Sequence, residues 1–166
     1  KQNYYVKGNG TGEPTAHLTE VVDPEGHKAR TESNDAGQLT KTIENYVDGT
    51  PGTDDDRTVE RTYDSYGRSD KIFAKGTEND QQTQFGYGTT RGIDYAEITS
   101  NDLMRRMKLP DPTTGAPSAE LDDWEQYNYN AQGERVFKRE PSASTNSLEH
   151  VYVFDDRGHL IHDRVV

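Results

Sequence analysis

The residues most often used in catalysis or metal binding are scattered along this 166-residue chain without a recognisable arrangement. His159 and His162 are three residues apart, and in a strand that spacing puts the two side chains on opposite faces. The glycine-rich segment 8–12 lacks the Lys-Ser/Thr pair of a phosphate-binding loop. Cysteine is absent, so disulfides and thiolate chemistry are excluded. We therefore predict no metal site and no cofactor.

Carboxylates are abundant but give no specific signal. Asp and Glu account for 30 residues, so neighbouring acids arise from composition alone. Glycosidase chemistry needs two carboxylates roughly 5–10 Å apart, and the sequence identifies no such pair. The acidic run 54–56 offers oxygen ligands for Ca²⁺ but lacks the spacing of an EF-hand loop, and we interpret it as a solvated loop. The sequence thus predicts no catalytic residue and no enzymatic activity, with a β-rich glycoside hydrolase left as a third hypothesis.

Three aromatic residues close in sequence could form a sugar-binding platform. They are Trp124, Tyr127 and Tyr129. Exposed aromatic faces are suited to stacking on sugars, whereas a thin sheet uses the same residues for cross-strand packing. Both interpretations remain open from the sequence.

The elements that must position these residues are marked by a recurring turn. Asp or Asn is followed three residues later by Gly at six places, more often than composition predicts, including residues 9–12 in the glycine cluster. Residues 111–115 carry the same signal with one extra residue. The five copies with strand-like flanks are Asp23 and Gly26, Asn34 and Gly37, Asp64 and Gly67, Asn130 and Gly133, and Asp155 and Gly158.

This spacing has a physical reason. A type I turn favours Asp or Asn at its first position and Gly at its fourth. The side-chain oxygen accepts hydrogen bonds from backbone amides in the turn, and glycine adopts the positive φ that lets the chain enter the next strand through a bulge. Each copy therefore predicts a hairpin tip, and the set predicts a series of hairpins.

Runs typical of strands flank the tips. The strand of residues 149–154 is apolar on both sides, so we expect it to be covered on both faces. Residues 101–109 fit a strand or a short helix, and we favour the strand. Further strands are predicted at residues 38–47, 58–63, 69–75, 82–87, 93–99, 124–129, 134–139 and 159–165.

The composition is typical of thin sheets that have one solvent-exposed face. The formal net charge is -11, which disfavours nucleic-acid binding, and no apolar run is long enough to insert into a membrane. The hydrophobic fraction is only 29%, so a large single core is not expected. The 10 Tyr and 4 Phe nevertheless favour half-buried strands over disorder.

The tips resemble those of a known family. The run Tyr63-Asp64-Ser65-Tyr66-Gly67-Arg68 resembles the core of the YD repeat of Rhs proteins, and residues 129–136 and 154–160 resemble variants of it. The paired tips at 23–26 and 34–37 are similar to the paired spacing common in that family. The resemblance covers most of the chain from about residue 21 onward.

The resemblance implies a segment of a large secreted or surface polypeptide. In such proteins the repeats form a β-ribbon that spirals into a shell around a toxin-like effector, or a cell-surface adhesion scaffold in teneurin-like members. Toxin-delivering members often end in an autocleaving segment with an Asp-Pro-x-Gly-Leu signature. Here Asp23-Pro24-Glu25-Gly26 is followed by His27, and residues 111–116 also depart from the signature, so no cleavage activity is carried over.

We therefore expect an all-β chain of consecutive antiparallel hairpins forming a curved or spiralling YD-repeat-like sheet. Residues 1–20 are predicted to form N-terminal strands and a glycine-rich turn, and residues 21–166 the hairpin array of a longer chain. The expected role is a non-enzymatic structural segment of a secreted or cell-surface, bacterial protein. Its expected partners are the remainder of its own polypeptide or copies of itself through strand edges, and an encapsulated effector domain or surface glycans. The alternative is a carbohydrate-binding or adhesion module that uses exposed aromatics.

Overall fold

The fold is built entirely from antiparallel strands. The computed structural model describes residues 2–8, 14–47, 56–76, 79–93, 96–119, 124–140, 148–154, 157 and 159–165, with side chains from residue 17 onward. The chain divides into two compact units, Lys1–Gln82 and Thr83–Val166. No helix occurs among the described residues. The predicted fold class, all-β with consecutive antiparallel hairpins, is confirmed.

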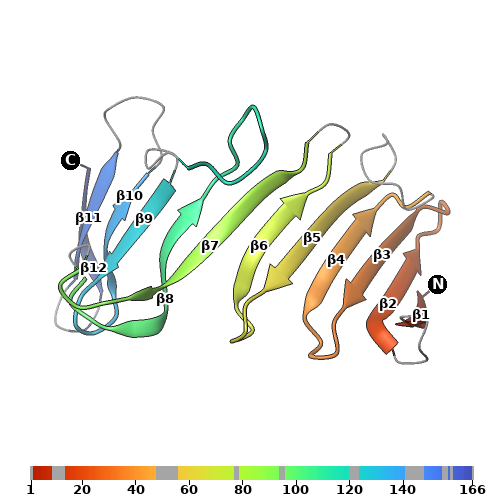
Figure 1. Ribbon diagram of the computed structural model, residues 1–166, viewed down its shortest axis with the longest axis horizontal. Coiled ribbons are helices and arrows are strands. Elements are labelled where there is room, and N and C mark those ends of the chain that lie inside the picture. The colour runs from red at the N-terminus through yellow and green to blue at the C-terminus, as the bar shows by residue number, and fades with distance from the viewer. Residues whose placement is uncertain are drawn as a thin grey trace. The chain divides into compact units, whose positions relative to one another are not determined.

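The first unit is a meander in which each strand pairs with the next along the chain (Figure 1). Every described pairing in it is antiparallel. Its strands are β1 (Gln2–Gly8), β2 (Pro14–Val22), β3 (Lys28–Ser33), β4 (Leu39–Glu44), β5 (Arg57–Tyr63) and β6 (Ser69–Ala74).

The second unit is built in the same way, and again each described pairing is antiparallel. Its first strand begins just before the boundary between the units. Its strands are β7 (Gln81–Thr89), β8 (Ser100–Lys108), β9 (Trp124–Tyr129), β10 (Arg135–Arg139), β11 (Glu149–Phe154) and β12 (Leu160–Val165).

Most hairpins shift their register by one residue next to the tip. In the β5–β6 hairpin the shift falls between Thr62 and Tyr63. Equivalent shifts occur in the β3–β4, β9–β10 and β11–β12 hairpins. The β2–β3 hairpin keeps a regular register up to its last pair, Val22 and Lys28. The bulge that follows the tip is therefore a repeated feature of the sheet rather than a local irregularity.

The sheet buries few apolar side chains, as a hydrophobic fraction of 29% suggests. Among the described residues, the buried hydrophobic ones are Ile43, Ala96, Tyr127 and Tyr129. Polar residues such as Thr58 and Asn128 are buried as well. Backbone ladders and side-chain hydrogen bonds therefore have to provide much of the stability that a large hydrophobic core would otherwise provide.

The predicted strand at residues 93–99 is wrong, because its described residues, 93 and 96–99, lie outside any strand, between β7 and β8. The Gly92 N–H donates to the Ala96 carbonyl at 2.9 Å, and the Ile93 N–H donates to the Thr90 carbonyl at 3.0 Å. Gly92 has a positive φ of 82°, so the chain turns before the apolar residues that suggested a strand. Residues 100–108 form a strand rather than a helix, as predicted.

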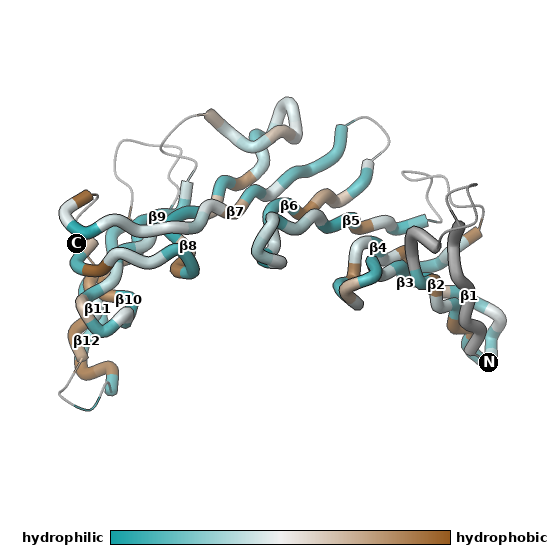
Figure 2. The backbone as a smooth tube through the Cα atoms, turned by 60° about the horizontal axis from the view of Figure 1, so that its bottom comes forward, coloured by the Kyte–Doolittle hydropathy of each residue, from teal (hydrophilic) through white to brown (hydrophobic). Residues whose placement is uncertain are grey.

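The expectation that residues 149–154 are covered on both faces is also wrong. In β11, Val151 and Val153 remain exposed. In β12, Leu160, Ile161 and Val165 are exposed as well. Figure 2 shows these hydrophobic stretches along β11 and β12. The apolar residues on both sides of this hairpin therefore face solvent in this chain.

Candidate functional site

The hairpin tips are the most regular feature of the molecule, and the β5–β6 tip shows their geometry. The Gly67 N–H donates to the Asp64 carbonyl at 3.0 Å, and the Asp64 N–H donates to the Arg68 carbonyl at 2.9 Å. Asp64 Oδ1 accepts from the N–H groups of Tyr66 and Arg68 at 2.9 and 3.0 Å. Gly67 has a φ of 79°, a conformation that costs little only for glycine.

The bond from the glycine N–H to the carbonyl of the first residue recurs at three other tips. At the β3–β4 tip the Gly37 N–H donates to the Asn34 carbonyl at 2.9 Å, and at the β9–β10 tip the Gly133 N–H donates to the Asn130 carbonyl at 3.0 Å. The β2–β3 tip has the corresponding bond from Gly26 at 3.2 Å. All three glycines have φ between 77° and 93°. Four hairpins of the chain therefore share the same type of turn.

The fifth residue of each tip also bonds the first through its side chain. Arg68 Nε donates to Asp64 Oδ2 at 2.8 Å. This bond is the main cause that holds the pKa of the Asp64 carboxyl below its ordinary value. At the β2–β3 tip, His27 Nδ1 lies 2.9 Å from the Asp23 carboxylate and lowers the Asp23 pKa in the same way. The two described aspartate tips therefore carry a nitrogen-bearing side chain, His27 or Arg68, at the fifth position.

Asparagine tips carry an acceptor at that position instead. Asn34 Nδ2 donates to Gln38 Oε1 at 2.9 Å, and Asn130 Nδ2 donates to Glu134 Oε2 at 2.8 Å. An amide has both a donor and an acceptor, so it can satisfy the turn amides through its oxygen and a fifth-position acceptor through its nitrogen. The first and fifth residues are thus chemically matched in all four tips.

Two tips are braced by the tyrosine that precedes their first residue. The Tyr63 hydroxyl donates to the Leu39 carbonyl on β4, and the Tyr129 hydroxyl donates to the Met104 carbonyl on β8, both at 2.7 Å. The described β4–β5 ladder ends at Lys41 opposite Glu60, two residues before Leu39. The tyrosine hydroxyl therefore satisfies a carbonyl that lies beyond the end of the ladder.

Neighbouring tips at one edge of the first unit also contact each other. Gln38 Nε2 donates to the Gly67 carbonyl at 2.7 Å. This bond joins the β3–β4 tip to the β5–β6 tip, 29 residues apart in sequence. A side-chain hydrogen bond therefore links two tips that no described ladder joins directly.

Residues 111–115 form a related turn with one more residue. Asp111 Oδ1 accepts from the N–H groups of Thr113 and Thr114 at 2.9 and 2.7 Å, and the two bonds lower the pKa of its carboxyl. The Gly115 N–H donates to the Asp111 carbonyl at 2.8 Å, with a φ of 71° at Gly115. The predicted tip at Asp155 and Gly158 lies outside the described residues.

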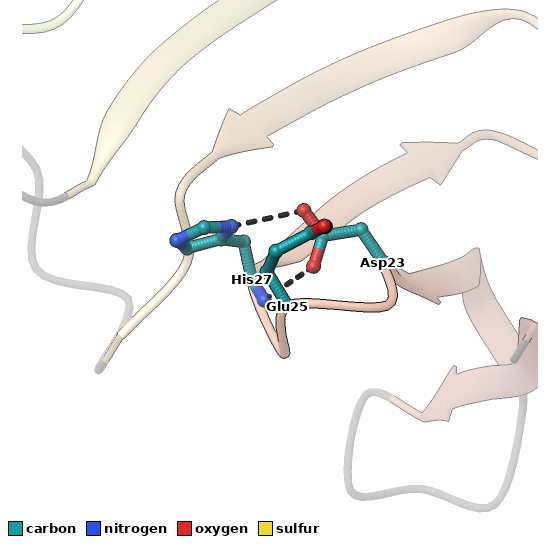
Figure 3. Close-up of side chains that lie close together, drawn as sticks. All are labelled: Asp23, Glu25 and His27. Carbon is teal, nitrogen blue, oxygen red and sulfur yellow. Dashed lines mark hydrogen bonds and ion pairs between the residues drawn. The ribbon is translucent and has the colours of Figure 1, made fainter.

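One group of side chains has metal-binding potential (Figure 3). Asp23, Glu25 and His27 lie in the β2–β3 tip with their ligand atoms within 4.8 Å of one another, and all three are exposed. However, the Asp23–His27 contact repeats the geometry of Asp64 and Arg68, and a guanidinium cannot bind a metal. The turn itself therefore explains why Asp23 and His27 lie together.

The acidic run 54–56 is not simply a solvated loop. Asp54 and Asp55 lie outside the described residues, but the Asp56 side chain is only 1% exposed. Its carboxylate accepts a hydrogen bond from the Val47 N–H at 2.6 Å. Asp56 therefore helps to close the connection between β4 and β5.

The three aromatics proposed for sugar binding do not form an exposed platform. Tyr127 is 4% exposed and Tyr129 is 9% exposed. The Tyr127 hydroxyl donates to Glu125, and burial is the main cause that raises the Tyr127 pKa. Trp124 is partly buried, and its Nε1 donates to the Ser118 carbonyl at 2.9 Å. Both tyrosines therefore pack in the sheet, and their hydroxyls bond the Glu125 side chain and the Met104 carbonyl.

The sequence interpretation missed the tyrosine hydroxyl bonds and the matched fifth positions. The signal for the second was visible, because His27 and Arg68 follow the aspartate tips whereas Gln38 and Glu134 follow the asparagine tips. The acceptors of the tyrosine hydroxyls could not be found without the register of the neighbouring strand.

Comparison with known proteins adds no family. No protein-family model matches the sequence, and no curated protein matches it.

Proposed function

We propose that this chain is a non-enzymatic structural segment of a secreted or cell-surface bacterial protein with repeats of the Rhs/YD type. Its hairpins would form part of a β-sheet shell or scaffold around or beside another domain. The observation that carries this proposal is the repetition of one tip geometry at four hairpins, with matched first and fifth residues. A repeated structural unit is suited to building an extended wall, because each repeat packs against its neighbours.

The distribution of polar bonds supports a structural role. The Tyr63 and Tyr129 hydroxyls, the Gln38 amide and the buried Asp56 carboxylate all bond backbone groups of the sheet. Side chains that hydrogen-bond the backbone in this way stabilise strand pairing and are not available to bind a substrate. None of the residues that the structure describes forms a helix long and apolar enough to cross a membrane.

The exposed edge strand β12 supports an association through strand edges. In the described part of the chain β12 pairs with β11, and its outer edge presents backbone donors and acceptors that a further strand can bind. Its side chains Leu160, Ile161 and Val165 are exposed. We propose that the remainder of its own polypeptide, or a second copy of the chain, covers this edge.

Sedimentation velocity over a range of concentrations tests the association. The isolated chain is expected to self-associate, and Ile161→Lys is expected to weaken this association because a charge on an edge strand opposes pairing. Ile161 is 65% exposed, so the substitution removes little buried surface. Val47→Lys is the matched control, since Val47 is 60% exposed but lies outside the edge strands. A chain that stays monomeric at every concentration, or an equal effect of both variants, contradicts the edge proposal.

The carbohydrate-binding alternative now depends on Trp124, because the two tyrosines are buried. Binding to a glycan array that is lost in Trp124→Ala would favour this alternative. The structural role predicts the same lack of binding for the wild-type chain and the variant.

A further inference from the structure

A hollow lies on one face of the second unit, over β9, β10 and β11. It measures about 500 Å³ and is lined by Asn128, Val136, Phe137, Glu149 and Val151. The three strands are neighbours in the sheet (Figure 1). Ligand-binding pockets usually measure about 300–1,000 Å³, so the hollow is large enough for a small molecule.

The strand register places the lining side chains on one face of the sheet. Phe137 lies opposite Asn128 on β9 and opposite Val151 on β11. Glu149 is two residues from Val151 and therefore points to the same face. The tyrosines on either side of Asn128 along β9 point to the other face. The hollow is therefore separate from the packing of these tyrosines.

A bulge in β10 shapes the hollow. The register of β10 against β9 shifts between Arg135 and Phe137, so the intervening Val136 has no opposite residue on β9. A bulge of this kind bends its strand and re-aims the side chains beside it. Val136 and Phe137 both line the hollow. Together with Val151 they form an apolar wall.

Asn128 brings an amide into this apolar surrounding. The residue is only 6% exposed, yet its side chain makes no hydrogen bond with any residue that the structure describes. Asn34 and Asn130, by contrast, use both the oxygen and the nitrogen of their amides inside the hairpin tips. The large majority of buried polar side chains have a partner. Because Asn128 lines the hollow, a molecule bound there can supply the partner that the described fold does not.

We propose that this hollow binds a neutral small molecule that has an apolar body and a primary amide. The Asn128 side chain has both a donor and an acceptor, so it can donate to and accept from another amide. The Glu149 carboxylate adds an acceptor to the lining. Val136, Phe137 and Val151 contact the apolar body of the ligand. The site goes beyond the proposed structural role, because a scaffold segment needs no small-molecule ligand.

An NMR titration of the isotope-labelled chain tests binding and locates it. Benzamide is the probe, because it joins an apolar ring to a primary amide. Benzoate has nearly the same shape but only acceptors, and acetamide has the amide without the apolar body. Saturable shifts of the Asn128 side-chain amide and of the Phe137 and Val151 backbone amides, with weaker binding of both control compounds, support the proposal. No saturable shift at these residues, or equal affinity for benzamide and either control compound, overturns it.

Asn128→Leu tests the amide, because leucine has nearly the same shape but no hydrogen-bonding group. The variant should bind benzamide about three- to ten-fold more weakly, as expected for the loss of one hydrogen bond, and should lose the preference for benzamide over benzoate. It should resist urea at least as well as the wild type, because no described side-chain hydrogen bond is lost. A loss of stability with unchanged benzamide binding would give Asn128 a structural role and overturn the proposal.

Val151→Thr tests the apolar wall and has a matched control. Val151 and Val153 lie two residues apart on the same face of β11 and are 37% and 45% exposed, but only Val151 is among the lining residues. Val151→Thr should weaken benzamide binding, because a hydroxyl replaces a methyl group in the wall. Val153→Thr should leave binding unchanged. Equal affinities of the two variants for benzamide contradict the proposed site.

Discussion

Replacing the tip glycines tests the physical basis of the repeated turn. Gly37 and Gly67 have nearly the same φ, 77° and 79°. A Cβ at position 37 would meet nothing within 4 Å, whereas a Cβ at position 67 would lie 3.2 Å from Gln38 Nε2. Gly37→Ala therefore measures the cost of the backbone conformation alone, and Gly67→Ala measures that cost together with the contact between two tips.

The expected magnitudes differ for this reason. The left-handed conformation costs a residue with a Cβ about 1–2 kcal/mol, so Gly37→Ala should lower the free energy of unfolding by about that amount. Gly67→Ala also disturbs the hydrogen bond from Gln38 to the Gly67 carbonyl. Such a bond contributes about 0.5–1.5 kcal/mol. The Gly67 variant should therefore be the less stable of the two by up to that difference.

Urea denaturation followed by far-UV circular dichroism measures both variants. Gly67→Asn is an informative third variant, because asparagine adopts the left-handed conformation more readily than alanine. It should recover part of the conformational cost. If Gly37→Ala and Gly67→Ala are as stable as the wild type, the positive φ does not restrict these positions and the explanation of the repeated turn is refuted.

Three further predictions follow from the bonds around the tips. Tyr129→Phe should lower the free energy of unfolding by about 0.5–1.5 kcal/mol, because the Met104 carbonyl loses its donor; Tyr66→Phe, at an exposed position, should have no effect in the same denaturation experiment. Asp64→Asn and Arg68→Gln should each lower the free energy of unfolding. The double variant should regain stability, because it recreates the Asn–Gln pair found at the β3–β4 tip. Additive losses in this double-mutant cycle would contradict the matched-pair explanation. The pKa of Asp64 is lowered in the fold below 3.8, so its stabilisation is present above that pH and is lost as the pH falls through the lowered value; an NMR titration of the Asp64 carboxyl that gives a value of 3.8 or higher would contradict this.

The sequence predicted the hairpins well because their tips are determined locally. The strand at residues 124–129 and the strand at residues 149–154 have the predicted bounds. The segment 93–99 was mispredicted because Ile93 and Ile98 suggest a strand, whereas hydrogen bonds around Gly92 turn the chain. Local signals of this kind compete with one another, and the sequence alone does not show which prevails.

The candidate sites were harder to predict because they depend on pairing between distant residues. Tyr129 was identified as a strand residue, but its acceptor, Met104, lies 25 residues away. Likewise, the position of Asn128 opposite Phe137 follows from the register of β9 and β10. The exposure of Val151 and Val153 depends on what lies above the sheet, and the sequence of the strand does not contain that information.

The bond between Gln38 and the Gly67 carbonyl has a mechanical consequence for the first unit. In a simple meander, pulling on one end can peel the strands away one after another, since each strand is held by its neighbours alone. A link between the tips of β3–β4 and β5–β6 bypasses the intervening ladder of β4 and β5. Under load, these four strands would tend to yield together, and the single amide of Gln38 would help to set the size of the unit that detaches.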